Sequence, residues 1–241
     1  MKVLAIIPSR YESSRFPGKP LIDLAGKTMI QRVYEGVANS NLFSEVVVAT
    51  DDERIAKNVS SFGGNYMMTA EEHRSGTDRC GEVIKKYSDF DVVVNIQGDE
   101  PLVDVEQLKI LISAFSDESV EIATIASPKI AVEDIQNSNR VKVVVDEKSD
   151  ALYFSRSPIP FEMSDEAYPF LRHIGLYAYR KNVLAELVGL QQTKLEKTES
   201  LEQLRWMYYG YKIRVQITEI ETPNIDVPSD VENVLRIILN K

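Results

Sequence analysis

The sequence predicts an α/β protein built on a mixed, mostly parallel sheet flanked by helices. Short apolar runs rich in β-branched residues alternate with longer segments whose apolar residues recur at helical spacing, as in βαβ units. From about residue 140 this rhythm changes, and strand-like runs follow one another with few helices between them. This second pattern predicts an antiparallel extension.

The first half of the chain carries the parallel part of the predicted sheet. Residues 3–8 are uniformly apolar, as expected for a strand buried on both faces. Met29, Ile30, Val33 and Val37 recur at helical spacing, and the residues TDDE at 50–53 resemble a helix N-cap. The expected strands are 3–8, 45–49, 66–68, 91–96 and 122–126, and the expected helices are 28–39, the segment from 53 to the glycines at 63 and 64, 77–87 and 108–115.

The second half is expected to begin with strands and to end with helices. The prolines at 158, 160 and 169 interrupt the connection between strand-like runs. The expected strands are 141–146, 151–155, 174–179 and 213–217, and the expected helices are 181–189, 195–209 and a last one from Ser229. Without repeats or a convincing linker, residues 1–241 are expected to form a single domain, with an antiparallel extension over about 140–180 that covers a crevice or pairs with another subunit.

The bulk composition excludes several classes of protein. The net charge of −9 argues against a general nucleic-acid-binding protein, which needs a basic face. Cys80 is the single cysteine, so an internal disulfide framework is excluded and a reducing cytoplasm is expected. We expect no signal peptide and no membrane insertion, because no apolar run reaches the ~20 residues that span a bilayer.

The segment after the first strand concentrates positive charge. Arg10, Arg15 and Lys19 lie within ten residues, together with a Pro-Gly turn. Arginine holds phosphate oxygens in a bidentate manner and lysine adds a compact charge, so three cations here suit a triphosphate. The loop has neither the Walker A pattern nor G-x-G-x-x-G. The alternative is a solvated loop with scattered cations.

Two carboxylates in other loops are candidate metal ligands. Asp99 follows a strand and a glycine in the run NIQGDEP, and Mg²⁺ prefers hard oxygen ligands. The alternative is that Asp99 or Glu100 only caps the next helix. In NIDVPSD, Ser229 and Asp230 are explained as capping residues, whereas Asp226 is not. Asp99 and Asp226 could form a metal site if the fold brings them together.

The run FLRHIGLYAYR at 170–180 alternates polar and apolar residues. Period-2 spacing places His173, Gly175, Tyr177 and Tyr179 on one face of a strand. A lone histidine on a strand is often structural, but a His/Tyr face also suits a hydroxyl-rich ligand. His73 is expected to be exposed and is assigned no role.

Taken together, several stretches resemble the 3-deoxy-manno-octulosonate (Kdo) cytidylyltransferase family. They occur in family order from residue 6 to 234: IIPSRYESSRFPGKPL, VVVATDDERI, HRSGTDR, VVNIQGDEP, ALYFSRSPIPF, FLRHIGLYAYR, LEQLRWMYYG and NIDVPSDVENV. The resemblance implies a nucleotide-diphosphosugar-transferase-like fold, a Rossmann-like three-layer sandwich, and a homodimer. It also implies the reaction of CTP with Kdo to CMP-Kdo and pyrophosphate, with Mg²⁺, in lipopolysaccharide biosynthesis.

The resemblance also implies roles for individual residues. The nucleotide would meet Arg10, Arg15, Lys19, Arg74, Ser75, Gly76, Thr77, Arg79 and Gln97. The sugar would meet Gln97, His173, Tyr177, Glu202 and Gln203. Asp99 and Asp226 would bind Mg²⁺, and Arg10, Lys19 and Asp99 would be catalytic. The chain departs from the family at Val227, commonly threonine, and in a short segment between Pro160 and Phe170.

Three other functions compete with this interpretation. A cytidylyltransferase for 8-amino-8-deoxy-Kdo or sialic acid would differ from this interpretation only in the sugar that it accepts. A glycosyltransferase would need the motif D-x-D in a loop at the end of a strand. Residues 99–101 are Asp-Glu-Pro instead, which counts against this function. A non-catalytic nucleotide sensor would lack a phosphate cation or a metal carboxylate, and all of them are present.

Overall fold

The chain folds into two compact units. The computed structural model describes residues 1–12, 16–163 and 168–240. The first unit consists of Met1–Val105 and Thr222–Lys241, and the second of Glu106–Glu221. The single-domain organisation expected from the sequence stays a prediction.

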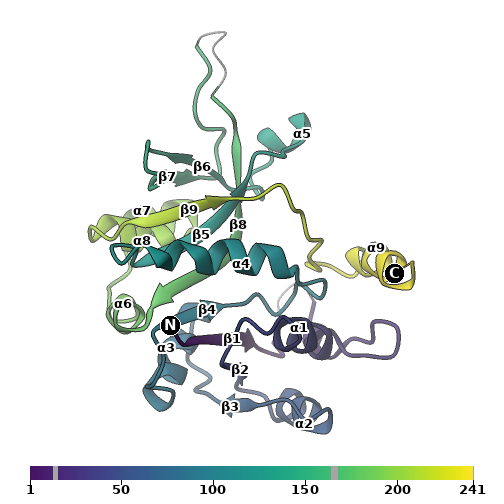
Figure 1. Ribbon diagram of the computed structural model, residues 1–241. Helices are drawn as coiled ribbons and strands as arrows, with labels where there is room; N and C mark the ends of the chain where they lie inside the picture. Colours follow the sequence, from purple (N-terminus) through teal and green to yellow (C-terminus); the bar gives the residue numbers. More distant parts are fainter. Residues whose placement is uncertain (13–15, 164–167, 241) are drawn as a thin grey trace. The chain divides into compact units, whose positions relative to one another are not determined.

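The described part of the first unit contains a parallel sheet in the order β3-β2-β1-β4. Its strands are β1 (Val3–Ser9), β2 (Glu45–Thr50), β3 (Tyr66–Met68) and β4 (Val92–Asn95), and they lie side by side in Figure 1. Residues 3–7 and 46–50 are all buried, which explains the uniformly apolar runs. Because the strands are parallel, the segments after β1, β2 and β4 leave from the same edge, as predicted.

Helices pack on this sheet, and their starts carry the capping residues visible in the sequence. Thr28, Asp52 and Ser75 each accept a hydrogen bond from a backbone N–H of the first turn. The helices are α1 (Met29–Ala38), α2 (Glu53–Ser61), α3 (Gly76–Lys86), α9 (Asp230–Leu239) and the 3-10 turn η1 (Lys19–Leu21). The C-terminal helix α9 returns to this unit, because Val234 joins a buried cluster with Leu24, Met29 and Ile225 (Figure 1).

The second unit contains both parallel and antiparallel pairs. β5 (Ile122–Ser127) runs parallel to β9 (Ile213–Ile217) and antiparallel to β8 (Leu171–Arg180). β6 (Lys142–Val145) and β7 (Ala151–Ser155) form an antiparallel hairpin, and β6 also pairs with β8. These pairings confirm the mixed, mostly parallel fold class and the antiparallel extension.

The helices of the second unit differ from the predicted ones at two points. The helix expected over 195–209 is interrupted, because Ser200 adopts a left-handed conformation with φ 51° and ends the first part. The short helix α5 has no buried residue, so it leaves no periodic signal in the sequence. The helices are α4 (Val105–Ser113, starting at the boundary), the 3-10 turn η2 (Ala114–Ser116), α5 (Val132–Ile135), α6 (Lys181–Leu187), α7 (Lys194–Glu199) and α8 (Gln203–Tyr208).

Among the helices of the described residues, none combines the length and the apolar character that crossing a membrane requires.

Candidate active site

Three loops of the first unit meet at Lys19. Its ammonium donates to Asp99 Oδ2 and to the carbonyl oxygen of Ile225, each at 2.8 Å. The backbone N–H of Ile225 in turn donates to the carbonyl oxygen of Asp99 at 3.0 Å. The fold therefore joins the loop after β1, the loop after β4 and the segment before α9, which are far apart in the sequence.

Asp226 directly follows Ile225 at this junction. Its Oδ2 accepts from Asn224 Nδ2 at 2.9 Å, and its backbone N–H donates to Asp230 Oδ2 at 2.8 Å. Asp230 also accepts from the backbone of Val227 at 3.0 Å, so it stabilises the turn before α9 as expected for a capping residue. The two carboxylates predicted to share a metal thus lie on segments whose backbones are hydrogen-bonded to each other.

Close backbone approach at the same sheet edge depends on Gly98, and Gly76 lies in ordinary contact with the same edge. A Cβ on Gly98 would lie 2.9 Å from the carbonyl oxygen of Pro8, a contact that real side chains do not tolerate. A Cβ on Gly76 would lie 3.4 Å from the Pro8 side chain and 3.5 Å from Asn95 Nδ2. The start of α3, which carries the predicted base- and ribose-binding residues, therefore lies beside the ends of β1 and β4.

The other predicted nucleotide-binding residues fall into different environments. Arg10 and Arg74 are exposed at this edge, and Arg15 lies outside the described residues. Arg79 is buried, with 3% of its surface exposed, and donates to Thr69 Oγ1 and to Asp51 Oδ2, the latter at 2.5 Å. This burial favours an indirect role in which Arg79 fixes the loop after β2. Its contact with a nucleotide stays a prediction.

The structure places His73 differently from the sequence expectation of an exposed residue. The side chain is 21% exposed, and Nε2 lies 2.5 Å from Glu82 Oε2. The same oxygen accepts from the backbone of Ala70 at 2.9 Å. This backbone bond, followed by the bond to His73, lowers the pKa of Glu82. His73 therefore fixes the segment before Arg74 to helix α3.

The second unit gathers the aromatic residues of β8 around Trp206 of α8. The ring of Tyr177 lies 5.3 Å from His173, 6.1 Å from Tyr179 and 5.2 Å from Trp206. His173 also meets Phe154 edge-on at 5.0 Å. These contacts confirm that His173, Tyr177 and Tyr179 share one face, although the ladder with β5 is irregular after Thr124.

His173 is a neutral hydrogen-bonding group in this cluster. Burial, and secondarily the charge of Arg172, lowers the pKa of His173 to about 3. Nε2 lies 3.0 Å from Thr124 Oγ1, whose single proton has the Leu176 carbonyl as an acceptor at 2.8 Å. If the hydroxyl donates to that carbonyl, it accepts from Nε2–H, and Nδ1 is left as an acceptor.

Buried polar groups of α8 adjoin the aromatic rings. Gln203 Nε2 and Trp206 Nε1 are buried and have no hydrogen-bond partner among the described residues. Such groups are costly unless a ligand or water pairs with them. Burial, followed by the charge of Glu202, raises the pKa of Tyr177 well above its usual value, so the phenol stays protonated. The cluster thus offers neutral donors and acceptors suited to hydroxyl groups.

A buried ion pair holds α8 against α7. Arg205 donates through Nε to Glu196 Oε2 at 2.8 Å and through Nη2 to Oε1 at 2.6 Å. Glu196 also forms a capping box with Thr193 at the start of α7. This pair fixes the helix that presents Glu202, Gln203 and Trp206. The sequence analysis assigned no role to Trp206. This residue is the only tryptophan of the sequence and lies within the motif LEQLRWMYYG, and these two facts were a usable signal.

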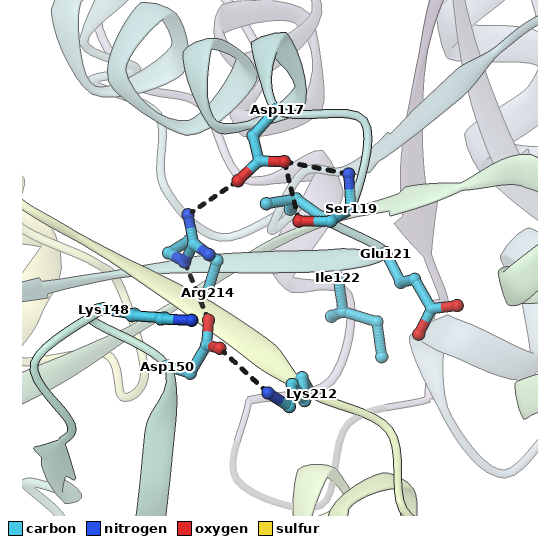
Figure 2. Close-up of a pocket in the computed structure, with 9 residues that line it drawn as sticks. Asp117, Ser119, Glu121, Ile122, Lys148, Asp150, Lys212 and Arg214 are labelled. Carbon is cyan, nitrogen blue, oxygen red and sulfur yellow. Dashed lines mark hydrogen bonds and ion pairs between the residues drawn. The ribbon is translucent and has the colours of Figure 1, made fainter.

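The second unit contains a separate cavity of about 520 Å³ near the starts of β5 and β9, and Figure 2 shows residues that line it. Arg214 donates to Asp150 at 2.8 Å and lies 3.6 Å from Asp117, and Lys212 lies 3.7 Å from Asp150. His173, by contrast, pairs with Ala126 near the other end of β5. The charges that line the cavity pair largely with one another, and the five residues predicted to meet the sugar do not line it.

Comparison with known proteins shows the family to which the chain belongs. A family model described as cytidylyltransferase matches residues 4–213. The chain is 49% identical to the 3-deoxy-manno-octulosonate cytidylyltransferase of Parabacteroides distasonis over 100% of both chains, and 51% identical to that of Phocaeicola vulgatus over 96% and 95%. The chain belongs to the 3-deoxy-manno-octulosonate cytidylyltransferase family. The family carries the catalytic activity of a nucleotidyltransferase, so the chain is an enzyme.

Solved structures support the fold of this family member. A structure of CMP:2-keto-3-deoxy-manno-octonic acid synthetase complexed with CTP matches with a TM-score of 0.95 and 42% identity, over 100% of this chain and 99% of the other. A 4-diphosphocytidyl-2C-methyl-D-erythritol synthase from Anaerococcus prevotii matches with a TM-score of 0.64 and 14% identity, over 99% and 98%. The second likeness shows the fold alone.

Proposed function

We propose that the protein transfers CMP from CTP to the anomeric hydroxyl of Kdo, giving CMP-Kdo and pyrophosphate. The observation that carries this proposal is the junction at Lys19, where a cation, Asp99 and the backbone next to Asp226 are joined by hydrogen bonds of 2.8–3.0 Å. Such a set suits a triphosphate and its counter-ion. The matching family members, named for this reaction, support the choice of substrates.

In the proposed reaction, the anomeric oxygen forms a bond to the α-phosphorus, and the bond from that phosphorus to the pyrophosphate oxygen breaks. The proton of the anomeric hydroxyl is released to solvent, and no side chain is assigned as the general base. Arg10 and Lys19 hold phosphate oxygens, with Arg15 as a further predicted contact. The two bonds recorded for Lys19 use two of its three donors, which leaves the third for phosphate. Positioning and charge neutralisation supply most of the rate.

Magnesium is the proposed cofactor. Mg²⁺ is commonly held by one or two carboxylates together with substrate phosphates and water, and Asp99 and Asp226 supply two carboxylates. Among the described residues, no group of three or more His, Cys, Asp or Glu side chains is arranged to hold a metal, so phosphate oxygens would complete the set. The bound ion would supply neutralisation of phosphate charge.

The sugar is proposed to meet the cluster of β8 and α8 in the second unit. Gln203 Nε2 is a buried donor without a partner among the described residues, and His173 offers Nδ1 as an acceptor in the tautomer inferred above. Tyr177 and Glu202 complete the predicted set, and Gln97 is proposed to meet both substrates. The uncharged groups of this cluster, Gln203, His173 and Tyr177, suit the hydroxyl groups of the sugar.

We further propose that the protein acts in the cytoplasm as a homodimer and supplies lipopolysaccharide biosynthesis. Leu152, Phe161 and Met163 of the antiparallel extension are 60%, 82% and 86% exposed, and such exposed apolar residues support pairing with a second copy. Light scattering should give twice the mass of the chain. Phe161→Ser with Met163→Ser should shift the population toward monomer, and a monomeric wild-type protein would refute the dimer.

The decisive experiment measures pyrophosphate release with each of CTP, UTP, ATP and GTP, paired with Kdo, 8-amino-Kdo or sialic acid. We expect release that requires CTP and Kdo and that is lost when Mg²⁺ is chelated. Faster release with another acidic sugar would change the substrate. If no pyrophosphate were released with any sugar, the proposed activity would be refuted.

A further inference from the structure

Tyr11 follows Arg10 in the loop after β1, and Arg54 of α2 covers its ring. The guanidinium carbon of Arg54 lies 3.2 Å from the ring centroid, within the range of a close cation–π contact. The guanidinium is held in place by Asp52, to which it donates from Nε at 2.9 Å and from Nη2 at 2.5 Å. The bonds to Arg54 lower the pKa of Asp52, so both charges persist at neutral pH. The ring is thus stacked on a fixed, charged plane.

The same tyrosine also contacts the far end of its loop. The backbone N–H of Gly18 donates to the carbonyl oxygen of Tyr11 at 2.9 Å. A Cβ on Gly18 would lie only 3.0 Å from Tyr11 Oη and 3.1 Å from Cζ, so the ring occupies the space of a side chain at position 18. Gly18 also has φ +71°, which disfavours any residue with a side chain.

These contacts link the two ends of the cationic loop to a helix. Arg10 immediately precedes Tyr11, and Lys19 immediately follows Gly18 and begins η1. Asp52 caps α2 by accepting from the backbone of Arg54 at 2.8 Å, so the stack is anchored at the rigid start of that helix. Without the ring, the bond between the backbones of Gly18 and Tyr11 would remain, but the stack that joins this end of the loop to α2 would be lost. Ordering Arg10 and Lys19 would then cost more conformational entropy on binding.

We propose that Tyr11, stacked between Arg54 and Gly18, is a positioning residue that holds Arg10 and Lys19 ready for the phosphates of the nucleotide. The proposal rests on the proposed function, since it assigns a task to the same phosphate-binding loop. In this proposal the aromatic ring, and not the hydroxyl, makes the contacts that position the loop. It also gives a reason for a glycine at position 18, where a side chain would crowd the ring.

The test measures the dissociation constant of CTP by isothermal titration calorimetry in the absence of sugar, together with the KM values for CTP and Kdo. Tyr11→Ala should weaken CTP binding about tenfold, the size expected for loss of a cation–π contact and its ordering effect. The KM for Kdo should stay within about twofold. Tyr11→Phe keeps the ring and should restore CTP binding to within about twofold of the wild type.

Matched variants separate stacking from charge. Arg54→Met removes the cation over the ring and should weaken CTP binding about as much as Tyr11→Ala, and the double variant should be no weaker than either single variant. Lys57→Met removes one positive charge from the same helix, where Lys57 pairs only with Glu53 at 3.4 Å among the described ion pairs, and should leave the constant unchanged. Arg54→Met also keeps the proposal testable if Tyr11→Ala does not fold.

Two results would overturn the positioning role. Unchanged CTP binding in folded Tyr11→Ala and Arg54→Met would show that the stack does not order the loop. Equal losses in Tyr11→Phe and Tyr11→Ala would show that the hydroxyl itself contacts the nucleotide. Failure of the proposed function would look different, because the wild type would release no pyrophosphate with any sugar while its affinity for CTP remained measurable.

Discussion

The two units each contain an ion pair beside predicted site residues, and the two pairs differ in burial and geometry. Lys19 and Asp99 of the first unit make one bond of 2.8 Å, and their side chains are 12% and 28% exposed. Arg205 and Glu196 of the second unit make two bonds, and their side chains are 8% and 7% exposed. The first pair can exchange its partners for ligand charges, whereas the second pair is part of the core and fixes a helix.

Breaking the buried pair should have the largest effect. Glu196→Gln removes the carboxylate with which Arg205 makes two bonds, and Glu202 at 3.8 Å is a more distant partner. The variant should lower the free energy of unfolding by about 3 kcal/mol, the lower end of the range for a buried pair that loses one partner. Chemical denaturation measures this loss. Glu232→Gln, which breaks an exposed pair with Arg236 on α9, is the matched control and should cost less than about 1 kcal/mol. Equal effects of the two variants would contradict the distinction.

The same pair predicts a pH dependence. Burial acts to raise the pKa of Glu196, but the bonds and charge of Arg205 outweigh it, and the pKa lies below the usual value. A depressed pKa stabilises the fold above the unfolded value of about 4.3 and loses that contribution as pH falls through the folded pKa. The wild type should therefore lose stability below about pH 4 more steeply than Glu196→Gln. Parallel curves would refute this assignment.

Changing the Lys19–Asp99 pair should act on catalysis instead of stability. Asp99→Asn removes a carboxylate predicted to bind Mg²⁺ and the charge partner of Lys19, and should lower kcat about 100-fold or more. Pyrophosphate release at saturating CTP and Kdo measures this, with a melting temperature as the folding control. Turnover close to that of the wild type in saturating Mg²⁺ would remove the role of Asp99.

The aromatic cluster should affect one substrate only. His173→Ala removes a neutral hydrogen-bonding group from the predicted sugar site and should raise the KM for Kdo about tenfold, as for one lost hydrogen bond, with the KM for CTP almost unchanged. Lys212→Met, in the cavity of Figure 2, is the control within the same unit and should change neither value. A matching rise in the KM for CTP would refute the assignment to the sugar.

The smallest effect concerns the pH dependence of sugar binding. Because burial keeps the pKa of His173 at about 3, the imidazole stays neutral above pH 5. Its depressed pKa stabilises the fold above the unfolded value of about 6.5, and this contribution declines as pH falls toward 3. The KM for Kdo should be flat between pH 6 and 8. A transition in this range that disappears in His173→Gln would contradict the neutral state.

Much of the first unit could be predicted because its strands are buried on both faces and its helices begin with capping side chains. Asp52, within the predicted cap TDDE, caps α2 in the structure, whereas the cap of α3 at Ser75 was not predicted. The polar loops after β1 and β4 leave from one edge because the strands are parallel. By contrast, the burial of His73 and Arg79 depends on partners at Glu82 and Asp51, and sequence spacing does not reveal such pairs.

In the second unit, the shared face of His173 and Tyr177 followed from period-2 spacing. The break at Ser200 did not, because a serine in the left-handed conformation is uncommon and the surrounding residues are good helix formers. The part played by Trp206 depends on α8 packing its indole against β8, a contact between segments about 30 residues apart. Such tertiary contacts carry no local signal.

The division of labour between the two units is tested most directly by the dissociation constant of CTP, measured by calorimetry without sugar in two variants. Lys19→Met should weaken binding about tenfold or more, because a charge-assisted hydrogen bond to phosphate is lost. Gln203→Leu should leave the constant within about twofold of the wild type, because the amide is predicted to meet the sugar. Equal weakening in both variants, or weakening in Gln203→Leu alone, would contradict the assignment of Lys19 to the nucleotide and of Gln203 to the sugar.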